Sequence, residues 1–391
     1  MKTRFLYLFF CGFVWLSVQA KAQKRHPVTH QLVPIQNTGD YLLEDGTLFG
    51  YQAKFGIINH SKGTYGLRFV MFESLESNPW LVILNGGPGR TNIRLPFEID
   101  SILSKYNLLL PGYRGVDDGA YENLSGRSDS TIEAFIRKNR TTYSTQKLVD
   151  DVMLICEMIH IDSFYIAAHS YGTIVGRTLY EANKENVTGL FEFSPVMESA
   201  PIPNPESLEF ITQHVADSLN VSLTAIEDTL NLWMQAPQKR DLAMGLIASF
   251  YVYNDAVTFF LDVLSGKLTR ANVSKKGREF LQFSWLMDYG MKFNRMPDID
   301  LTGCDIYTKI SHLFYLQVSK YLPSDAPVVE HRFVSEGYMP CAVSFIPKYE
   351  IFHTCSGKQI YNVLCECGHA DLWKMAPYYI FEYRNSINPQ P

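Results

Sequence analysis

Apolar runs of strand length alternate with amphipathic runs of helix length along the middle of the chain, and this alternation constrains the fold more than any other feature. The strand-like runs are "YGLRFVMFES", "PWLVILNGG", "NLLLPGYRG", "SFYIAAHS" and "GLFEFSP". The helix-like runs are "YGTIVGRTLYEANK" and "TQKLVDDVMLICEMIHI", which places Leu148, Val152 and Ile155 at helical spacing. Because parallel strands need crossover connections, the alternation predicts a mostly parallel, doubly wound α/β sheet.

The alternation stops near Pro195 and gives way to helical patterns rich in aromatic residues, such as "LIASFYVYNDAVTFFLDVL". We therefore predict a helical cap over residues 201–300, inserted into a sheet domain of residues 23–200 and 301–391. The sheet resumes most clearly in "QIYNVLCECGH", and the chain closes with the amphipathic "WKMAPYYIFEYRNSI". Before the first predicted strand, the sequence reads as a polar lead-in to about residue 45.

The first 22 residues have the three parts of a secretory signal: early cations, the apolar run "FLYLFFCGFVWLSV", and small residues at Ala20 and Ala22. The run is shorter than the roughly 18 to 20 apolar residues of a spanning helix, which disfavours a membrane anchor. Cys11 lies inside the run rather than at its end, which disfavours a lipid-modified cysteine. We expect cleavage after Ala20 or Ala22, export to the periplasm or the exterior, and no membrane insertion afterwards.

The charge and the cysteines exclude several classes of protein. The formal charge of −5 becomes −8 when the signal removes three cations, and no basic block appears, so nucleic acid is not an expected partner. Six of the seven cysteines remain without Cys11, which is compatible with disulfides in an exported chain. Their pairing is open, with Cys341 and Cys355 as the first pair to consider. No paired C-x-x-C or histidine spacing occurs, so no metal site is predicted.

The segment Ala168-His169-Ser170-Tyr171-Gly172 lies between a predicted strand and a predicted helix. A serine on such a turn is exposed above the sheet edge, and the amide of the next residue, Tyr171, points where an oxyanion would form. The usual pattern is G-x-S-x-G, and here alanine replaces the first glycine. The alternative interpretation of Ser170 is a helix N-cap.

A second segment, "NGGPG", ends an upstream strand at Asn85 and includes Gly87. Glycines let backbone amides face a bound oxygen without side-chain interference. In hydrolases of this architecture the loop after this strand supplies the second oxyanion donor, and we assign that amide to Gly87. A plain Gly-Pro turn is the alternative, but the order of the two segments favours the oxyanion loop.

With these motifs the chain resembles the proline iminopeptidase and tripeptidyl aminopeptidase family of serine exopeptidases, which have the α/β-hydrolase fold. The resemblance covers roughly residues 50 to 385 and rests on "NGGPG", "PGYRG", "TQKLVDDV", Ser170 and "CECGHADLW". The family has H-G-G-P-G and D-Q-R-G, so Asn85 replaces a histidine, and Gly112 and Tyr113 replace Asp and Gln. These departures leave the nucleophile intact and leave the substrate preference open.

The catalytic base comes last in chain order in this architecture, and His369 follows a predicted strand and a glycine. His169 adjoins Ser170 on the same turn and is interpreted as pocket lining or turn packing. In the resembling family the acid stands on a loop after a late strand, and Glu336 in "VVEHRFVSEG" has a comparable position. Asp325 in "LPSDAP" is the rival, because the preceding "HLFYLQV" is either a strand or a helix.

The family resemblance implies release of residues from the amino end of short peptides, without a cofactor. An exopeptidase must pair the α-ammonium group of its substrate with an acid, because burying that charge without a partner would cost several kcal/mol. The acids considered for this role are Glu198, Glu227, Asp255 and Asp288. An esterase or amidase acting on a small molecule with the same triad, and an inactive hydrolase fold used for binding, are the alternatives. The oligomeric state is left open.

Overall fold

The computed structural model describes most of the predicted sheet and part of the helical insertion. The described residues are 41–59, 66–87, 91–117, 127–139, 142–195, 205–237, 239–245, 256–267, 301–319, 350–356, 359–365 and 369–387. Contacts divide the chain into two compact units, one containing the sheet and the other containing the helical insertion. The chain crosses between the units several times, and one boundary falls within a short helix near the C-terminus, between Leu372 and Trp373.

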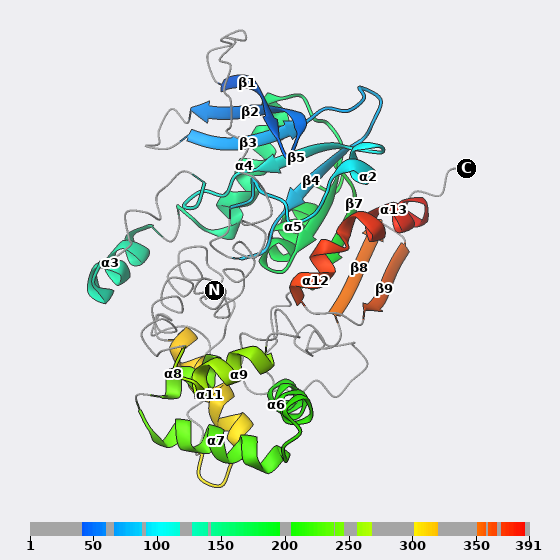
Figure 1. The fold of residues 1–391 in the computed structure, drawn as a ribbon. Helices are drawn as coiled ribbons and strands as arrows, with labels where there is room; N and C mark the ends of the chain where they lie inside the picture. The colour runs from blue at the N-terminus through cyan, green and yellow to red at the C-terminus, as the bar shows by residue number, and fades with distance from the viewer. Residues whose placement is uncertain are drawn as a thin grey trace. The chain divides into compact units, whose positions relative to one another are not determined.

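The strands of the described segments form one sheet in the order β1-β2-β3-β5-β4-β6-β7-β8-β9 (Figure 1). They are β1 (Tyr41–Leu48), β2 (Tyr51–Asn59), β3 (Gly66–Phe72), β4 (Trp80–Leu84), β5 (Asn107–Pro111), β6 (Phe164–His169), β7 (Val187–Phe193), β8 (Glu350–Ser356) and β9 (Gln359–Cys365). Strands β5, β4, β6 and β7 run parallel. Antiparallel pairs join β1, β2 and β3 to one side of them and β8 to the other. The predicted parallel sheet is therefore confirmed at the centre, with antiparallel additions on both sides.

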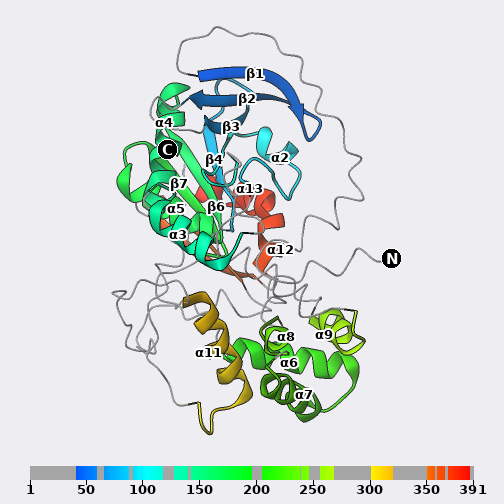
Figure 2. The same cartoon turned by 90° about the vertical axis from the view of Figure 1, so that its left-hand side faces the viewer.

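Helices cover both faces of the parallel strands. The helices of the sheet unit are α2 (Asp100–Leu103), α3 (Asp129–Asn139), α4 (Thr145–Met158), α5 (Tyr171–Ala182), part of α12 (His369–Lys374), and α13 (Ala376–Ile387). Helices α4 and α5 pack together on one face, and α2 and α13 pack together on the other (Figure 2). This double cover explains why the central strands are apolar without alternation: Leu81, Ile83 and Ala167 have no exposed surface.

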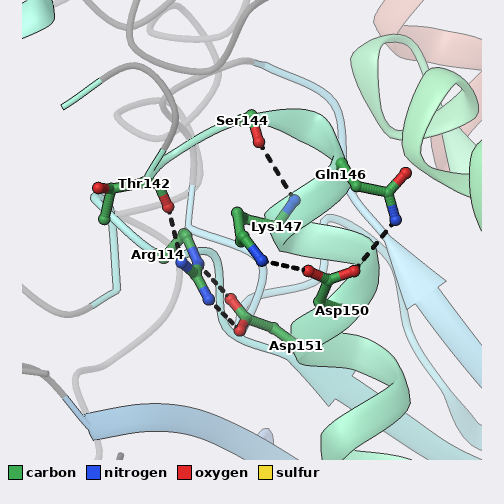
Figure 3. Close-up of polar contacts among 7 residues, drawn as sticks. All are labelled: Arg114, Thr142, Ser144, Gln146, Lys147, Asp150 and Asp151. Atoms are coloured by element: carbon green, nitrogen blue, oxygen red, sulfur yellow. Dashed lines mark hydrogen bonds and ion pairs between the residues drawn. The ribbon is translucent and has the colours of Figure 1, made fainter. Parts of the chain in front are cut away.

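The N-terminus of α4 is fixed by a cap and by a buried ion pair (Figure 3). The side chain of Ser144 accepts a hydrogen bond of 3.3 Å from the Lys147 amide. Arg114, in the loop after β5, donates hydrogen bonds to both carboxylate oxygens of Asp151 and to the Thr142 carbonyl, the last at 2.6 Å. The Arg114 and Asp151 side chains are 5% and 4% exposed. The "PGYRG" segment thus ties β5 to the helix that leads into β6.

The β1–β2 hairpin was not anticipated, because the sequence up to about residue 45 reads as a polar lead-in. Its two-residue turn places Phe49 and Gly50 at φ of 55° and 87°, the left-handed region of a tight hairpin. The glycines in these two strands weaken the sequence pattern of a strand. In the structure, the ring of Phe69 on β3 covers Gly56 so closely that a Cβ on Gly56 would lie 2.0 Å from the ring. Aromatic rings on neighbouring strands supply the packing that these glycines lack.

The described part of the helical insertion contains α6 (Pro205–Leu219), α7 (Leu223–Gln235), α8 (Arg240–Gly245), α9 (Ala256–Leu264) and α11 (Ile306–Ser319). Helix α11 contacts α6, α7 and α8, so the helical unit continues past residue 300. Of the two interpretations of "HLFYLQV", the structure has the helix. Trp233 of α7 and Phe260 of α9 are in ring contact at 5.3 Å, and both are buried. These two rings lie in the core of the unit beside buried aliphatic side chains such as Leu230.

The predicted signal, residues 1–22, lies outside the described residues. Within the described part of the chain, no helix combines the length and the apolar character needed to cross a membrane.

Candidate active site

The pairing of β4 with β6 brings the two glycine-containing turns together. The strands are parallel neighbours, and their last paired residues are Leu84 and Ala168. The segments that follow, Asn85-Gly86-Gly87 and His169-Ser170-Tyr171, therefore leave the same edge of the sheet side by side. A Cβ placed on Gly86 would lie 2.7 Å from the Cβ of Ser170 and 2.8 Å from Nδ1 of His169. Only glycine fits at this position against the serine turn.

The backbone of Ser170 is strained, and its side chain does not cap the helix that follows. Its φ of 52° and ψ of −124° lie outside the regions that L-residues ordinarily occupy. It stands at the N-cap position of α5, yet its side chain makes no capping hydrogen bond. Its carbonyl accepts instead from the amide of Thr173 at 2.9 Å and the hydroxyl of Thr173 at 2.7 Å. Strain of this kind, about 1 to 3 kcal/mol, is typical of functional turns. The geometry disfavours the alternative of a helix-cap serine.

Two glycines of α5 let the helix approach the strands closely enough to make this turn. A Cβ on Gly172 would lie 2.2 Å from the Leu84 carbonyl oxygen. One turn later, a Cβ on Gly176 would lie 3.1 Å from the Cβ of Ala168. Alanine can therefore stand where the G-x-S-x-G pattern has its first glycine, because the helix presents a glycine to its methyl group.

Asn85 holds the start of the glycine loop through all of its polar groups. Its amide nitrogen donates to Asn92 Oδ1 at 2.5 Å, and its carbonyl accepts from the Tyr113 hydroxyl at 3.0 Å. Its side-chain Nδ2 donates to the Arg94 carbonyl at 2.7 Å, and its Oδ1 accepts from Nε1 of Trp373 at 2.9 Å. The residue is 5% exposed. Gly87, two residues later, has a φ of 150°, which favours glycine.

Two tyrosines support the predicted oxyanion loop and the residue after Ser170. Tyr113 and Tyr171 are buried with their rings at 85° and centroids 6.5 Å apart. The Tyr171 hydroxyl is hydrogen-bonded to the Thr145 hydroxyl at 3.1 Å. Burial, with smaller effects of Tyr171 and Asp117, raises the pKa of Tyr113 well above its usual value. Tyr113 therefore stays protonated at neutral pH and serves as a permanent donor to Asn85.

His169 packs against the turn, as one of its two sequence interpretations expects. Its ring lies parallel to the Trp373 indole, with an interplanar angle of 8° and centroids 5.4 Å apart. The residue is 4% exposed. Trp373 also contacts the rings of Phe97 and Phe193, each at a centroid distance of 5.1 Å. In the sequence, Trp373 is marked only as the last residue of "CECGHADLW".

The structure thus places Gly87, His169, Ser170 and Tyr171 on neighbouring turns. His369 is the first residue of α12. The predicted acid Glu336, its rival Asp325, and Glu198 lie outside the described residues, as do Asp255 and Asp288. Glu227 lies in α7, where Oε1 accepts from the Tyr307 hydroxyl of α11 at 2.8 Å. This hydrogen bond links α7 to α11.

The strand order, the helices on both faces, and a strained serine between the third parallel strand and its helix define the α/β-hydrolase fold.

Comparison with known proteins adds the following. No family model matches the chain, and no curated protein matches it. Among solved structures, a proline iminopeptidase-related protein from Thermus thermophilus is 16% identical over 86% of this chain and 96% of its own, with a TM-score of 0.35. A 2-hydroxy-6-oxo-6-phenylhexa-2,4-dienoate hydrolase from a Rhodococcus species is 14% identical over 82% and 96%, with a TM-score of 0.34.

An α/β hydrolase from Novosphingobium aromaticivorans is 20% identical over 44% of this chain, with a TM-score of 0.27, and the match spans 52% of that protein. A second structure, VinJ, is also matched over about half of its length, 49%. These similarities assign no activity to the chain.

Proposed function

We propose that the protein is a serine hydrolase whose nucleophile is Ser170. The observation that carries this proposal is the backbone of Ser170, held at φ 52° and ψ −124° without a capping bond and packed against Gly86. A fold keeps such strain where it serves a function. The conformation, at the carboxyl end of β6 and the start of α5, matches the strand-to-helix turn that presents a nucleophile in α/β hydrolases.

The proposed reaction is acyl transfer to Ser170. The hydroxyl attacks a carbonyl carbon while His369 accepts its proton, and the amides of Gly87 and Tyr171 hold the oxyanion. Collapse of the tetrahedral intermediate breaks the bond to the leaving group, which takes the proton from His369. Water then repeats the sequence on the acyl-enzyme. The acid that orients His369 is Glu336 in this proposal, with Asp325 as the alternative.

A fluorophosphonate probe tests the nucleophile directly. The wild-type protein should become labelled on Ser170, and Ser170→Ala should not. His369→Ala should slow labelling by several orders of magnitude, because the base no longer accepts the hydroxyl proton. A folded wild-type protein that remains unlabelled would overturn the proposal and leave the interpretation as a binding protein.

Within this class, we propose an aminopeptidase that acts on short peptides. The support comes from the sequence motifs "NGGPG" and "CECGHADLW" and from the helical insertion between β7 and β8, where acids could pair a substrate ammonium. The experiment compares a proline-aminoacyl reporter with its amino-acetylated form. An aminopeptidase loses activity on acetylation, because its acid pairs the free amine. Equal hydrolysis of both reporters would instead indicate an esterase or amidase.

We also propose that the mature protein is exported. The support is the signal pattern of residues 1–22. Sequencing the N-terminus of protein expressed from the full chain should find a start directly after Ala20 or Ala22, and an intact N-terminus in a soluble cytoplasmic fraction would contradict export.

A further inference from the structure

We propose that Trp373 is a positioning residue for the oxyanion loop and that it acts through the side chain of Asn85. This inference rests on the proposed function, because it assigns the segment from Asn85 to Gly87 the task of holding an oxyanion. It gives a specific role to the last residue of the "CECGHADLW" motif, which is 288 positions from Asn85 in the chain.

The orientation of the Asn85 amide is fixed by the chemistry of its partners. A Trp indole can only donate, and a backbone carbonyl can only accept. The indole Nε1 of Trp373 at 2.9 Å therefore selects Oδ1, and the Arg94 carbonyl at 2.7 Å selects Nδ2. A flipped amide would lose both bonds. Nδ2 also donates longer hydrogen bonds of 3.4 Å to the carbonyls of Thr91 and Asn92. The side chain thus has one permitted orientation, and Trp373 is the donor that selects its Oδ1.

Trp373 is itself held rigidly enough to act as a reference point. It is 2% exposed and lies among the rings of Phe97, His169 and Phe193. The Trp373 indole contacts both turns: it contacts His169, which precedes Ser170, and Asn85, which precedes Gly86. It therefore gives a shared contact to two turns that the pairing of β4 with β6 already places side by side.

The consequence for the oxyanion loop follows from its geometry. The loop continues from Asn85 into two glycines, which have no side chains to restrain them, and Gly86 lies against Ser170. Side-chain hydrogen bonds that restrain these three residues therefore come from Asn85, in addition to the packing of Gly86. Preorganised amides cost no reorganisation when charge develops, so loss of this restraint should slow the reaction more than it weakens substrate binding.

The chain also connects this contact to the predicted base. Trp373 lies on α12, the helix that begins at His369.

The experiment measures the rate of fluorophosphonate labelling of the full-length protein. Trp373→Phe removes the indole donor and keeps an aromatic ring among its neighbours. Asn85→Leu removes the acceptor. Phe97→Leu is the matched control, because it loosens the same cluster and leaves the hydrogen bond in place. Thermal unfolding of each variant, followed by circular dichroism, reports whether it folds.

We expect Trp373→Phe to slow labelling about five- to tenfold, the size of one lost buried hydrogen bond, and Phe97→Leu to stay within about twofold of wild type. The double variant with Asn85→Leu should label no more slowly than Asn85→Leu alone, because both remove the same bond. For a substrate, Trp373→Phe should lower kcat and leave KM nearly unchanged.

Three results would overturn the inference: labelling of Trp373→Phe at the wild-type rate, equal slowing by Phe97→Leu, or effects that multiply in the double variant. If Trp373→Phe does not fold, Asn85→Leu decides, since wild-type labelling of that variant contradicts the inference. Failure of the wild type to label would refute the proposed function instead. In that case, faster deuterium exchange at residues 81–96 in Trp373→Phe than in Phe97→Leu still tests the positioning role.

Discussion

Gly172, at the start of α5, lies so close to Leu84, at the end of β4, that a methyl group on the glycine would come within 2.2 Å of the Leu84 carbonyl oxygen. This contact lets the helix follow the serine turn directly, and it makes the turn sensitive to one added carbon.

Gly172→Ala should therefore destabilise the fold by at least about 2 kcal/mol, because a backbone carbonyl of a central strand cannot move aside. Gly176→Ala is the matched control on the same helix. Its nearest contact is a methyl group at 3.1 Å, and the gain in helix propensity, about 1 kcal/mol, offsets the crowding. Urea unfolding followed by circular dichroism measures both. Equal losses in the two variants would contradict the close approach at Gly172.

Ser170→Gly should be more stable than Ser170→Ala by about 1 kcal/mol. Both variants remove the nucleophile, but glycine adopts a φ of 52° without strain, and the relief of about 1 to 3 kcal/mol exceeds the entropic cost of glycine. Comparing the free energies of unfolding of the two variants checks the prediction. A Ser170→Gly variant less stable than Ser170→Ala would show that the turn is not strained.

Asp151→Ala and Asp150→Ala should have very different costs although the residues are adjacent (Figure 3). Asp151 is buried with Arg114, and its removal leaves an uncompensated buried charge at a cost of about 3 to 5 kcal/mol. The pair of Asp150 with Lys147 is 43% and 48% exposed, so Asp150→Ala should cost less than about 1 kcal/mol. Denaturant unfolding tests the difference, and similar costs for both variants would refute it.

Tyr51 should make stability depend on pH in the alkaline range. A hydrogen bond to Asp100, with burial and the charge of Asp100, raises the pKa of Tyr51 to about 12. Because the folded pKa exceeds the unfolded value of 10.0, the contribution to stability is complete below pH 10 and is lost as the pH rises through about 12.

Tyr51→Phe removes this titrating group. The difference in unfolding free energy between wild type and Tyr51→Phe should shrink between about pH 10 and pH 12, and Asp100→Asn should reduce the effect. A difference that stays constant over this range would show that Tyr51 titrates alike in both states.

Much of the sheet could be predicted from the sequence because its central strands are buried on both faces. The runs around Leu81 and Ile166 are apolar, and the run around Phe191 is interrupted only by Thr188 and Glu192. Helical patterns separate these runs, so both strand and crossover are visible in the order of residues. The β1–β2 hairpin was missed for the opposite reason. Its glycines and charged residues resemble a loop, and its strand character depends on Phe69 of β3, which pairing brings onto Gly56.

The candidate site divides in the same way. Ser170, Gly87 and Tyr171 are found from local patterns, because a turn between a strand and a helix is encoded by neighbouring residues. Other features depend on the distance between elements, which no local pattern contains. They are the strain at Ser170, the parallel pairing that brings Gly86 against Ser170, and the close packing of Gly176 on Ala168.

By itself, the sequence determined the order of the central strands and helices, the serine at the turn, and the glycines of the loop beside it, since each follows from the chemistry of adjacent residues. Only the tertiary structure decided that Asn85 holds that loop and that Trp373, far along the chain, holds Asn85. A hydrogen bond between two buried side chains requires both to be brought together and shielded from water, and folding alone sets that geometry.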